Sequence, residues 1–221
     1  MKEKTRYKLI HYTTGEEIFS AVTHGVGALF GIFATVYMIL ISAFGGSAPA
    51  VVYSAIYGGT LIVLYTMSTL YHAITNKTAK IVFRVMDHTT IFLLIAGTYT
   101  PIALLALKGA LGWTIFGLEW GIAVLGIVLN SISIEKFKVF SMIGYIISGW
   151  AIVVAAVPLF QSVPLQAVIY LLGGGLFYTG GLIFYRMKHL RYMHSVWHIF
   201  VLMGSILQFI AIAVYILPEA F

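Results

Sequence analysis

The stretch Tyr192-Met193-His194-Ser195-Val196-Trp197-His198 opens the last long apolar segment of the chain and carries two histidines four residues apart. On a helix this spacing places both imidazoles on one face, one turn apart. Two neutral imidazoles held in this way supply half of a tetrahedral zinc site. Polar side chains at the start of an apolar segment are costly unless a partner satisfies them, so we expect other segments to bring polar groups to this place.

The composition is that of a membrane protein. Of the 221 residues, 61% are hydrophobic and 9% are charged, and the mean hydropathy is +0.99, whereas soluble domains carry roughly 25% charged residues. The chain has no cysteine, which excludes disulfides and thiolate metal sites, so histidine, carboxylate, hydroxyl or water must hold any metal. The net charge of +6 indicates basic loops on one side of a membrane, and no nucleic-acid partner is expected.

Hydropathy predicts an all-α fold, a single seven-transmembrane helix bundle over residues 1–221. Seven apolar segments are each long enough to cross a bilayer, and they span residues 18–43, 50–74, 81–107, 110–130, 139–159, 164–185 and 194–217. Glycine, proline and asparagine punctuate the short connections, so none of them can hold an independent domain. Because residues 1–17 are polar, no cleavable signal peptide is expected.

The distribution of basic residues predicts the orientation. One side of the bundle carries Lys108, and the other carries Lys2, Lys4, Arg6, Lys8, Lys77, Lys80, Arg84, Lys136, Lys138, Arg186, Lys188 and Arg191. Because cytoplasmic loops are enriched in lysine and arginine, the N-terminus is expected in the cytoplasm and the C-terminus outside. This topology brings five scattered polar residues to one depth in the inner leaflet, namely His24, His72, Asp87, His194 and His198.

Ser68 and His72 form a second pair at helical spacing, with a hydroxyl and an imidazole on one helix face. Taken alone, the pair favours an interfacial histidine that reaches to water, with the serine bonded to its own backbone. With His194 and His198 at the same depth, we favour three imidazoles around one metal ion. Three histidines with an open fourth position are typical of catalytic zinc rather than structural zinc.

Asp87 allows two interpretations. It either pairs with Arg84, three residues earlier, or it faces inward and ligates the metal or accepts a hydrogen bond from water on the metal. An intramembrane carboxylate is a functional candidate. The neighbouring His88 points about 100° away from Asp87 on a helix, so we expect it at the interface and not among the ligands.

Glu17 and His24 are seven residues apart, on one helix face. In one interpretation Glu17 is a helix-start carboxylate favoured by the macrodipole and His24 is a packing histidine. In the other, both residues form hydrogen bonds to the metal ligands. Glu119 lies within the fourth span, too deep to join them, and is protonated or paired with a neighbouring helix. Pro101 is expected to kink the third span. His11 and His189 are expected to be solvated, and the aromatic residues are assigned no cofactor role.

These motifs resemble those of the haemolysin III proteins, the bacterial branch of the progestin and adipoQ receptor family, which are also similar to alkaline ceramidases. The resemblance covers nearly the whole chain, in motif order and spacing, and is carried by Glu17 to His24 with Gly25 and Gly27, Ser68-x3-His72, Arg84-Val-Met-Asp87-His and His194-x3-His198. It implies zinc held by His72, His194 and His198, with Ser68 and Asp87 flanking the water at the zinc. The long cytosolic N-terminal region of the animal receptors is missing, so we expect a minimal bacterial protein of the cell membrane rather than a hormone receptor.

The resemblance to ceramidases implies a zinc-dependent hydrolase of a lipid amide or ester at the inner leaflet, with a membrane lipid as substrate. Asp87 would orient the water or accept its proton, and Ser68 would hold the water or the oxyanion. One alternative is a non-enzymatic membrane protein with structural or regulatory zinc in lipid or energy homeostasis. Another is a pore-forming haemolysin, although seven apolar spans argue against a secreted toxin. A transporter would be expected to show repeats or paired broken helices. The sequence indicates no particular oligomeric state.

Overall fold

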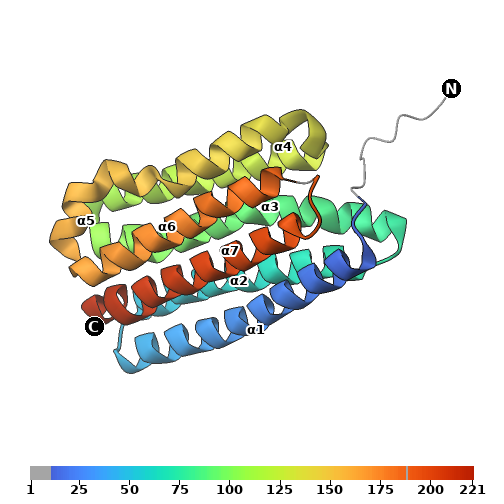
Figure 1. The fold of residues 1–221 in the computed structure, drawn as a ribbon. Coiled ribbons are helices and arrows are strands. Elements are labelled where there is room, and N and C mark those ends of the chain that lie inside the picture. The colour runs from blue at the N-terminus through green and yellow to red at the C-terminus, as the bar shows by residue number, and fades with distance from the viewer. Residues whose placement is uncertain (1–10, 188) are drawn as a thin grey trace.

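The computed structural model describes residues 11–187 and 189–221, and over these residues the fold is all-helical, without strands. Lys2, Lys4, Arg6, Lys8 and Lys188, which entered the prediction of orientation, lie outside the described residues. The long helices run alongside one another as a bundle (Figure 1), and in chain order the elements are α1 (Thr14–Phe44), α2 (Ala48–Ala73), α3 (Lys77–Pro101), η1 (Ile102–Leu107), α4 (Gly109–Gly149), η2 (Ala151–Ala155), α5 (Ala156–Ser162), α6 (Leu165–Arg186), α7 (Met193–Ile210), η3 (Ala211–Ile216) and η4 (Pro218–Ala220). The prediction of an all-α fold is therefore confirmed.

Six helical stretches in the described part of the chain are long and apolar enough to cross a membrane, and one of them, Gly109–Ser162, is far longer than a bilayer requires. Within it Ser133 has non-helical backbone angles, φ −168° and ψ 110°. The Ser141 hydroxyl donates a hydrogen bond to Asn130 Oδ1 at 2.7 Å, although eleven residues of straight helix would separate them by about 16 Å. The chain therefore folds back at Ser133, and two legs of α4 lie side by side (Figure 1). The first leg contains the predicted segment 110–130, and the return leg contains the first part of the predicted segment 139–159, which continues through η2 and α5.

Three helices begin earlier than hydropathy predicts, at Thr14, Ala48 and Lys77 instead of residues 18, 50 and 81. In each case a polar side chain accepts a hydrogen bond from the first helical turn: Thr13 at α1, Ser47 at α2 and Asn76 at α3. Such caps satisfy the free backbone N–H groups of a helix start. At α1 and α3 hydropathy does not extend to these turns because they are polar.

The third helix changes its hydrogen-bonding repeat at the proline singled out in the sequence. The α-helix ends at Pro101, and residues 102–107 continue as a π-helical turn. Proline lacks the N–H that would continue the α ladder, and the Thr100 hydroxyl donates to the carbonyl of Ala96 at 2.9 Å one turn earlier. Where the proline N–H is missing, the helix therefore continues as a wider, π-helical turn.

The outer surface of the bundle is apolar, and polar side chains are buried inside it beside an apolar core. Along α1 the exposed side chains include Ile18, Val22 and Leu29, whereas Ser20 and His24 are buried. This is the reverse of a soluble helix and is suited to a lipid surface.

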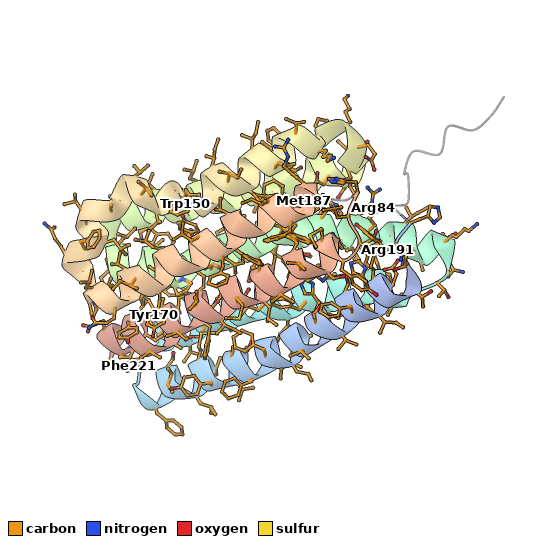
Figure 2. All side chains as sticks on the ribbon, viewed as in Figure 1. Arg84, Trp150, Tyr170, Met187, Arg191 and Phe221 are labelled. Atoms are coloured by element: carbon orange, nitrogen blue, oxygen red, sulfur yellow. The ribbon has the colours of Figure 1, made fainter. Side chains whose placement is uncertain are left out.

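The histidines of α2 and α7 lie at one end of the bundle. α1, α3 and α7 begin there and α2 and α6 end there (Figure 1). Figure 2 places Arg84 and Arg191 at this end, and Trp150 and Phe221 toward the other. The histidines of α2 and α7 are therefore brought together from segments more than 100 residues apart, because both helices terminate at the same end.

Candidate metal centre

Three histidine side chains converge between α2 and α7. His72 lies in the last turn of α2, and His194 and His198 lie in the first two turns of α7. Nε2 of His194 is 3.3 Å from Nε2 of His72 and 3.2 Å from Nε2 of His198, and one ligand atom from each residue lies within 4.8 Å of the other two. Nitrogens bound to one tetrahedral zinc at ~2.0–2.1 Å would lie about 3.4 Å apart. The spacing fits a metal ion without large rearrangement.

Glu17 determines which nitrogen of His72 faces the cluster. Its Oε2 lies 2.6 Å from Nδ1 of His72, so the ring donates its Nδ1–H to the carboxylate and presents a lone pair at Nε2. The other carboxylate oxygen pairs with Nζ of Lys80 at 2.8 Å. A histidine held from behind by a carboxylate is the usual arrangement around protein-bound metals. The alternative of Glu17 as only a helix-start charge does not account for this contact.

Hydrogen bonds among the histidines cannot satisfy all three Nε2 atoms. His72 Nε2 has no hydrogen while Glu17 holds its Nδ1–H, so it can only accept. His194 can donate to His72 or accept from His198, but a neutral imidazole does not do both through one nitrogen. The three residues are almost inaccessible, at 3%, 5% and 0% exposed for His72, His194 and His198. A cation would satisfy all three lone pairs.

His24 lies directly behind this cluster. Its ring stacks on that of His198 with centroids 3.7 Å apart and planes 20° apart, and it meets Tyr65 edge to face at 5.0 Å. His24 does not belong to the group of three convergent ligand atoms. The structure therefore places it in contact with a candidate ligand rather than among the ligands.

Asp87 is not paired with Arg84. The Arg84 guanidinium instead donates to Glu135 Oε1 at 2.6 Å, which joins α3 to the turn of α4. The nearest ionic partner of Asp87 is His88, whose Nδ1 lies 3.6 Å from Oδ2 and donates to the Arg84 carbonyl at 2.9 Å. His88 thus lies closer to Asp87 than helical projection suggests, because its ring turns back along the preceding helical turn. It is not one of the three convergent histidines.

Asp87 and Ser68 are both buried near the histidines. Ser68 is completely inaccessible and lies one turn before His72 on α2, and among the described residues its hydroxyl has no hydrogen-bond partner. Asp87 is 4% exposed and, together with His194, lines an internal cavity. The roles predicted for Ser68 and Asp87 remain predictions, and their positions are compatible with them.

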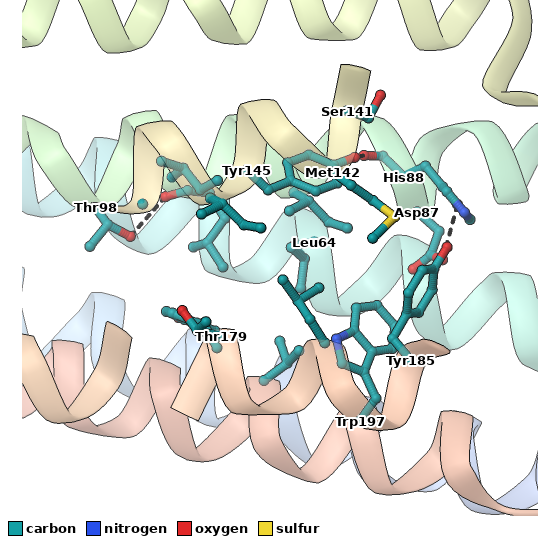
Figure 3. Close-up of a pocket in the computed structure, with 18 of the residues that line it drawn as sticks. Leu64, Asp87, His88, Thr98, Ser141, Met142, Tyr145, Thr179, Tyr185 and Trp197 are labelled. Carbon is teal, nitrogen blue, oxygen red and sulfur yellow. Dashed lines mark hydrogen bonds and ion pairs between the residues drawn. The ribbon is translucent and has the colours of Figure 1, made fainter. Parts of the chain in front are cut away.

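The cavity has a volume of about 150 Å³ and lies between α3 and α4 on one side and α6 and α7 on the other. Figure 3 shows Asp87 and His88 at one end and Thr98 toward the other, with Leu64, Met142 and Trp197 along the wall. Its lining is predominantly apolar, and the acidic group of Asp87 lies at one end. A long apolar cavity that reaches a polar cluster suits a ligand with a hydrocarbon chain and one polar head.

Two residues near the cluster, Tyr12 and Glu16, were not identified from the sequence. The Tyr12 ring stacks on that of His194, with centroids 4.7 Å apart and planes 19° apart. Glu16 accepts a hydrogen bond from the backbone N–H of Tyr192 at 2.8 Å. The pattern Thr13-x-x-Glu16 is a capping-box signature that could have drawn attention to Glu16, whereas nothing in the sequence distinguishes Tyr12 from the other aromatic residues.

The remaining polar candidates lie apart from the cluster. Glu119 is 1% exposed in the first leg of α4, and among the described residues neither of its carboxylate oxygens has a hydrogen-bond partner. Protonation of Glu119 or its pairing with a neighbouring helix stays a prediction. His11 and His189 are exposed, as expected.

Fold and site together define a multi-pass, all-helical membrane protein with a buried three-histidine cluster at one end. The chain belongs to the haemolysin III family, whose model, described as "Haemolysin-III related", matches residues 12–209.

Curated relatives agree with this assignment. Hemolysin-3 of Bacillus cereus is 41% identical over 93% of the chain and 94% of its own length. A Hemolysin-3 homolog of Bacillus subtilis (strain 168) is 40% identical over 95% of the chain and 99% of its own length. The human monocyte to macrophage differentiation factor is 28% identical over 73% of the chain and 69% of its own length. No solved structure matches the chain significantly. The protein is thus a multi-pass membrane protein of a bacterial type.

Proposed function

We propose that the protein is a zinc-dependent hydrolase that cleaves a lipid amide or ester at the inner leaflet of the cell membrane. The observation that carries the proposal is the convergence of three Nε2 atoms beside a cavity that Asp87 also lines. His72, His194 and His198 would hold the metal. Bound Zn²⁺ supplies Lewis acidity, which polarises a carbonyl oxygen and acidifies water.

The protein's own residues would divide the remaining work. Asp87 accepts the proton of the attacking water as oxygen adds to the acyl carbon, and returns a proton to the departing amine or alcohol as the C–N or C–O bond breaks. Ser68 would donate its hydroxyl hydrogen to the acyl oxygen, since among the described residues this hydroxyl has no other hydrogen-bond partner. Glu17 keeps His72 in the tautomer that presents Nε2 to the metal.

The apolar cavity supports a lipid substrate. Its walls would receive an acyl chain while the polar end presents the amide or ester to Asp87 and the metal. The site lies at the start of α7, in the first turns of a membrane-crossing segment, so a lipid could enter from the bilayer without leaving it.

We also propose seven crossings with the N-terminus in the cytoplasm. The two legs of α4 support the count. The described basic residues at the site end support the orientation, because they include Lys77, Lys80, Arg84, Lys136, Lys138, Arg186 and Arg191, whereas Lys108 lies at the other end.

A structural metal is the second candidate. Its ligands come from α2 and α7, so an ion would cross-link two distant segments, and the three side chains are almost inaccessible. The name of the Bacillus cereus relative, Hemolysin-3, adds a haemolytic pore as a third candidate. Dye leakage from liposomes that persists after metal removal would favour that pore.

The deciding experiment measures fatty acid released from long-chain N-acyl amides and acyl esters in mixed micelles, using the purified full-length chain loaded with zinc. Release by the wild type that is lost in Asp87→Asn, with zinc content unchanged in the variant, supports the hydrolase. A wild type that holds zinc, releases no fatty acid from any lipid in the panel and loses thermal stability when the metal is removed supports the structural site instead.

A further inference from the structure

We propose that Glu16 is a positioning residue of the metal centre, which holds the first turn of α7, and with it His194 and His198, against α1. The proposal rests on the metal site proposed above. Glu16 is not one of the convergent ligands. It acts through the backbone of Tyr192, two residues before His194.

Tyr192 is the N-cap residue of α7. Its φ of 63° is in the left-handed region, which is unusual for a residue other than glycine. Its carbonyl accepts a hydrogen bond from the N–H of Val196 at 2.8 Å, the first bond of the helix, and its own N–H donates to Glu16 Oε1 at 2.8 Å. Loss of that acceptor would leave the N–H unpaired and the left-handed conformation without support.

Both oxygens of the Glu16 carboxylate are used. While Oε1 accepts from Tyr192, Oε2 accepts from the Thr13 N–H at 2.8 Å and from the Thr13 hydroxyl at 2.7 Å. The residue is 8% exposed, so water does not substitute readily. An amide offers one acceptor and one donor group, so glutamine would set its NH₂ against a backbone N–H on one of the two sides.

Glu16 is the first of three contacts that join α1 to α7 at one-turn intervals. The Ser20 and Ser195 hydroxyl oxygens are 3.0 Å apart, and His24 stacks on His198 one turn further. Residues 16, 20 and 24 thus face residues 192, 195 and 198. The face of α1 that begins at Glu16 sets the position of the helix that carries two of the three candidate ligands.

If Glu16 only capped α1, its loss would have the same effect as loss of the Thr13 cap. The Thr13 side chain accepts from the Glu16 N–H at 3.3 Å and completes the cap of α1, so Thr13→Ala removes the cap and leaves the Glu16–Tyr192 bond in place. Glutamine can keep its oxygen on the Tyr192 N–H, so Glu16→Ala is the variant that removes this bond. The two variants therefore separate the stability of α1 from the position of α7.

The test loads the full-length wild type, Glu16→Ala and Thr13→Ala with Co²⁺ in detergent and records the visible absorption of the bound ion and the rate of its loss to a chelator. We expect an altered spectrum and about tenfold faster loss in Glu16→Ala, the lower range for groups that orient ligands, with Thr13→Ala like the wild type. If Glu16→Ala does not fold, Glu16→Asp, which keeps the charge but shortens the reach, should change both readouts in the same direction. A Glu16 variant that behaves as Thr13→Ala overturns this inference alone, whereas a wild type that takes up no Co²⁺ overturns the metal centre together with it.

Discussion

Glu17 Oε2 lies 2.6 Å from His72 Nδ1, so a carboxylate at the start of α1 sets the tautomer of a histidine at the end of α2. The consequence is chemical, since the ring nitrogen that faces His194 is left with a lone pair. Although Glu16 and Glu17 are adjacent, they contact two different helices. Glu16 accepts a hydrogen bond from the backbone of Tyr192, which leads into α7, and Glu17 accepts one from the His72 side chain on α2.

The first prediction concerns the ligands. His194→Ala removes the nitrogen that lies between those of His72 and His198, so it should abolish metal binding. Asp87→Ala should keep most of the metal, because Asp87 is not one of the convergent groups. Mass spectrometry of purified protein should find about one zinc per wild-type chain. Equal metal content in the wild type and His194→Ala would rule out this ligand set.

The second prediction concerns the carboxylate behind His72. Glu17→Gln should weaken metal binding by about 10–100-fold, because an amide is a poorer acceptor for the His72 Nδ1–H. Lys80→Met is the matched control, since it removes the other partner of Glu17 and leaves the histidine contact intact. Competition with a chelator of known affinity measures both variants. Should Lys80→Met weaken binding as much as Glu17→Gln, the charge of the pair rather than the tautomer of His72 would be responsible.

The third prediction concerns packing between α1 and α2. A Cβ at Gly27 would collide with the ring of Tyr65, and this ring cannot retreat easily because its hydroxyl donates to Ser205 at 2.7 Å. Gly27→Ala should therefore destabilise the protein by about 1–3 kcal/mol. Gly59→Ala on α2, where a Cβ meets nothing within 4 Å, should show no such loss. Thermal unfolding in detergent compares them, and equal stability of the two variants would contradict the close contact.

Much of the site could be anticipated because it depends on helical spacing and on topology. The pairs Ser68/His72 and His194/His198 lie one turn apart in sequence, and short loops between membrane-length helices allow α2 to end where α7 begins. The convergence of the three histidines follows from these two facts. The chemical roles of Ser68 and Asp87 do not follow from them and remain predictions.

The partners of the charged groups could not be anticipated, since they depend on how each helix is rotated about its axis. Arg84 is three residues from Asp87 in sequence yet pairs with Glu135, which the fold-back of α4 at Ser133 brings within reach. The stacking of Tyr12 on His194 depends on the path of the chain before α1. Hydropathy does not report either of these arrangements.

The last prediction concerns the number of crossings and uses the absence of cysteine from the chain. Lys108, Lys136 and Gln161 are exposed before, at and after the two legs of α4, so a single cysteine at each position can be labelled without background. If α4 crosses the membrane and returns, a membrane-impermeant maleimide should label Lys108→Cys and Gln161→Cys in intact cells. Lys136→Cys should react only after permeabilisation, because basic turns are retained in the cytoplasm. If Gly109–Ser162 instead crossed once, Lys108→Cys and Gln161→Cys would lie on opposite sides, and only one of them would react in intact cells.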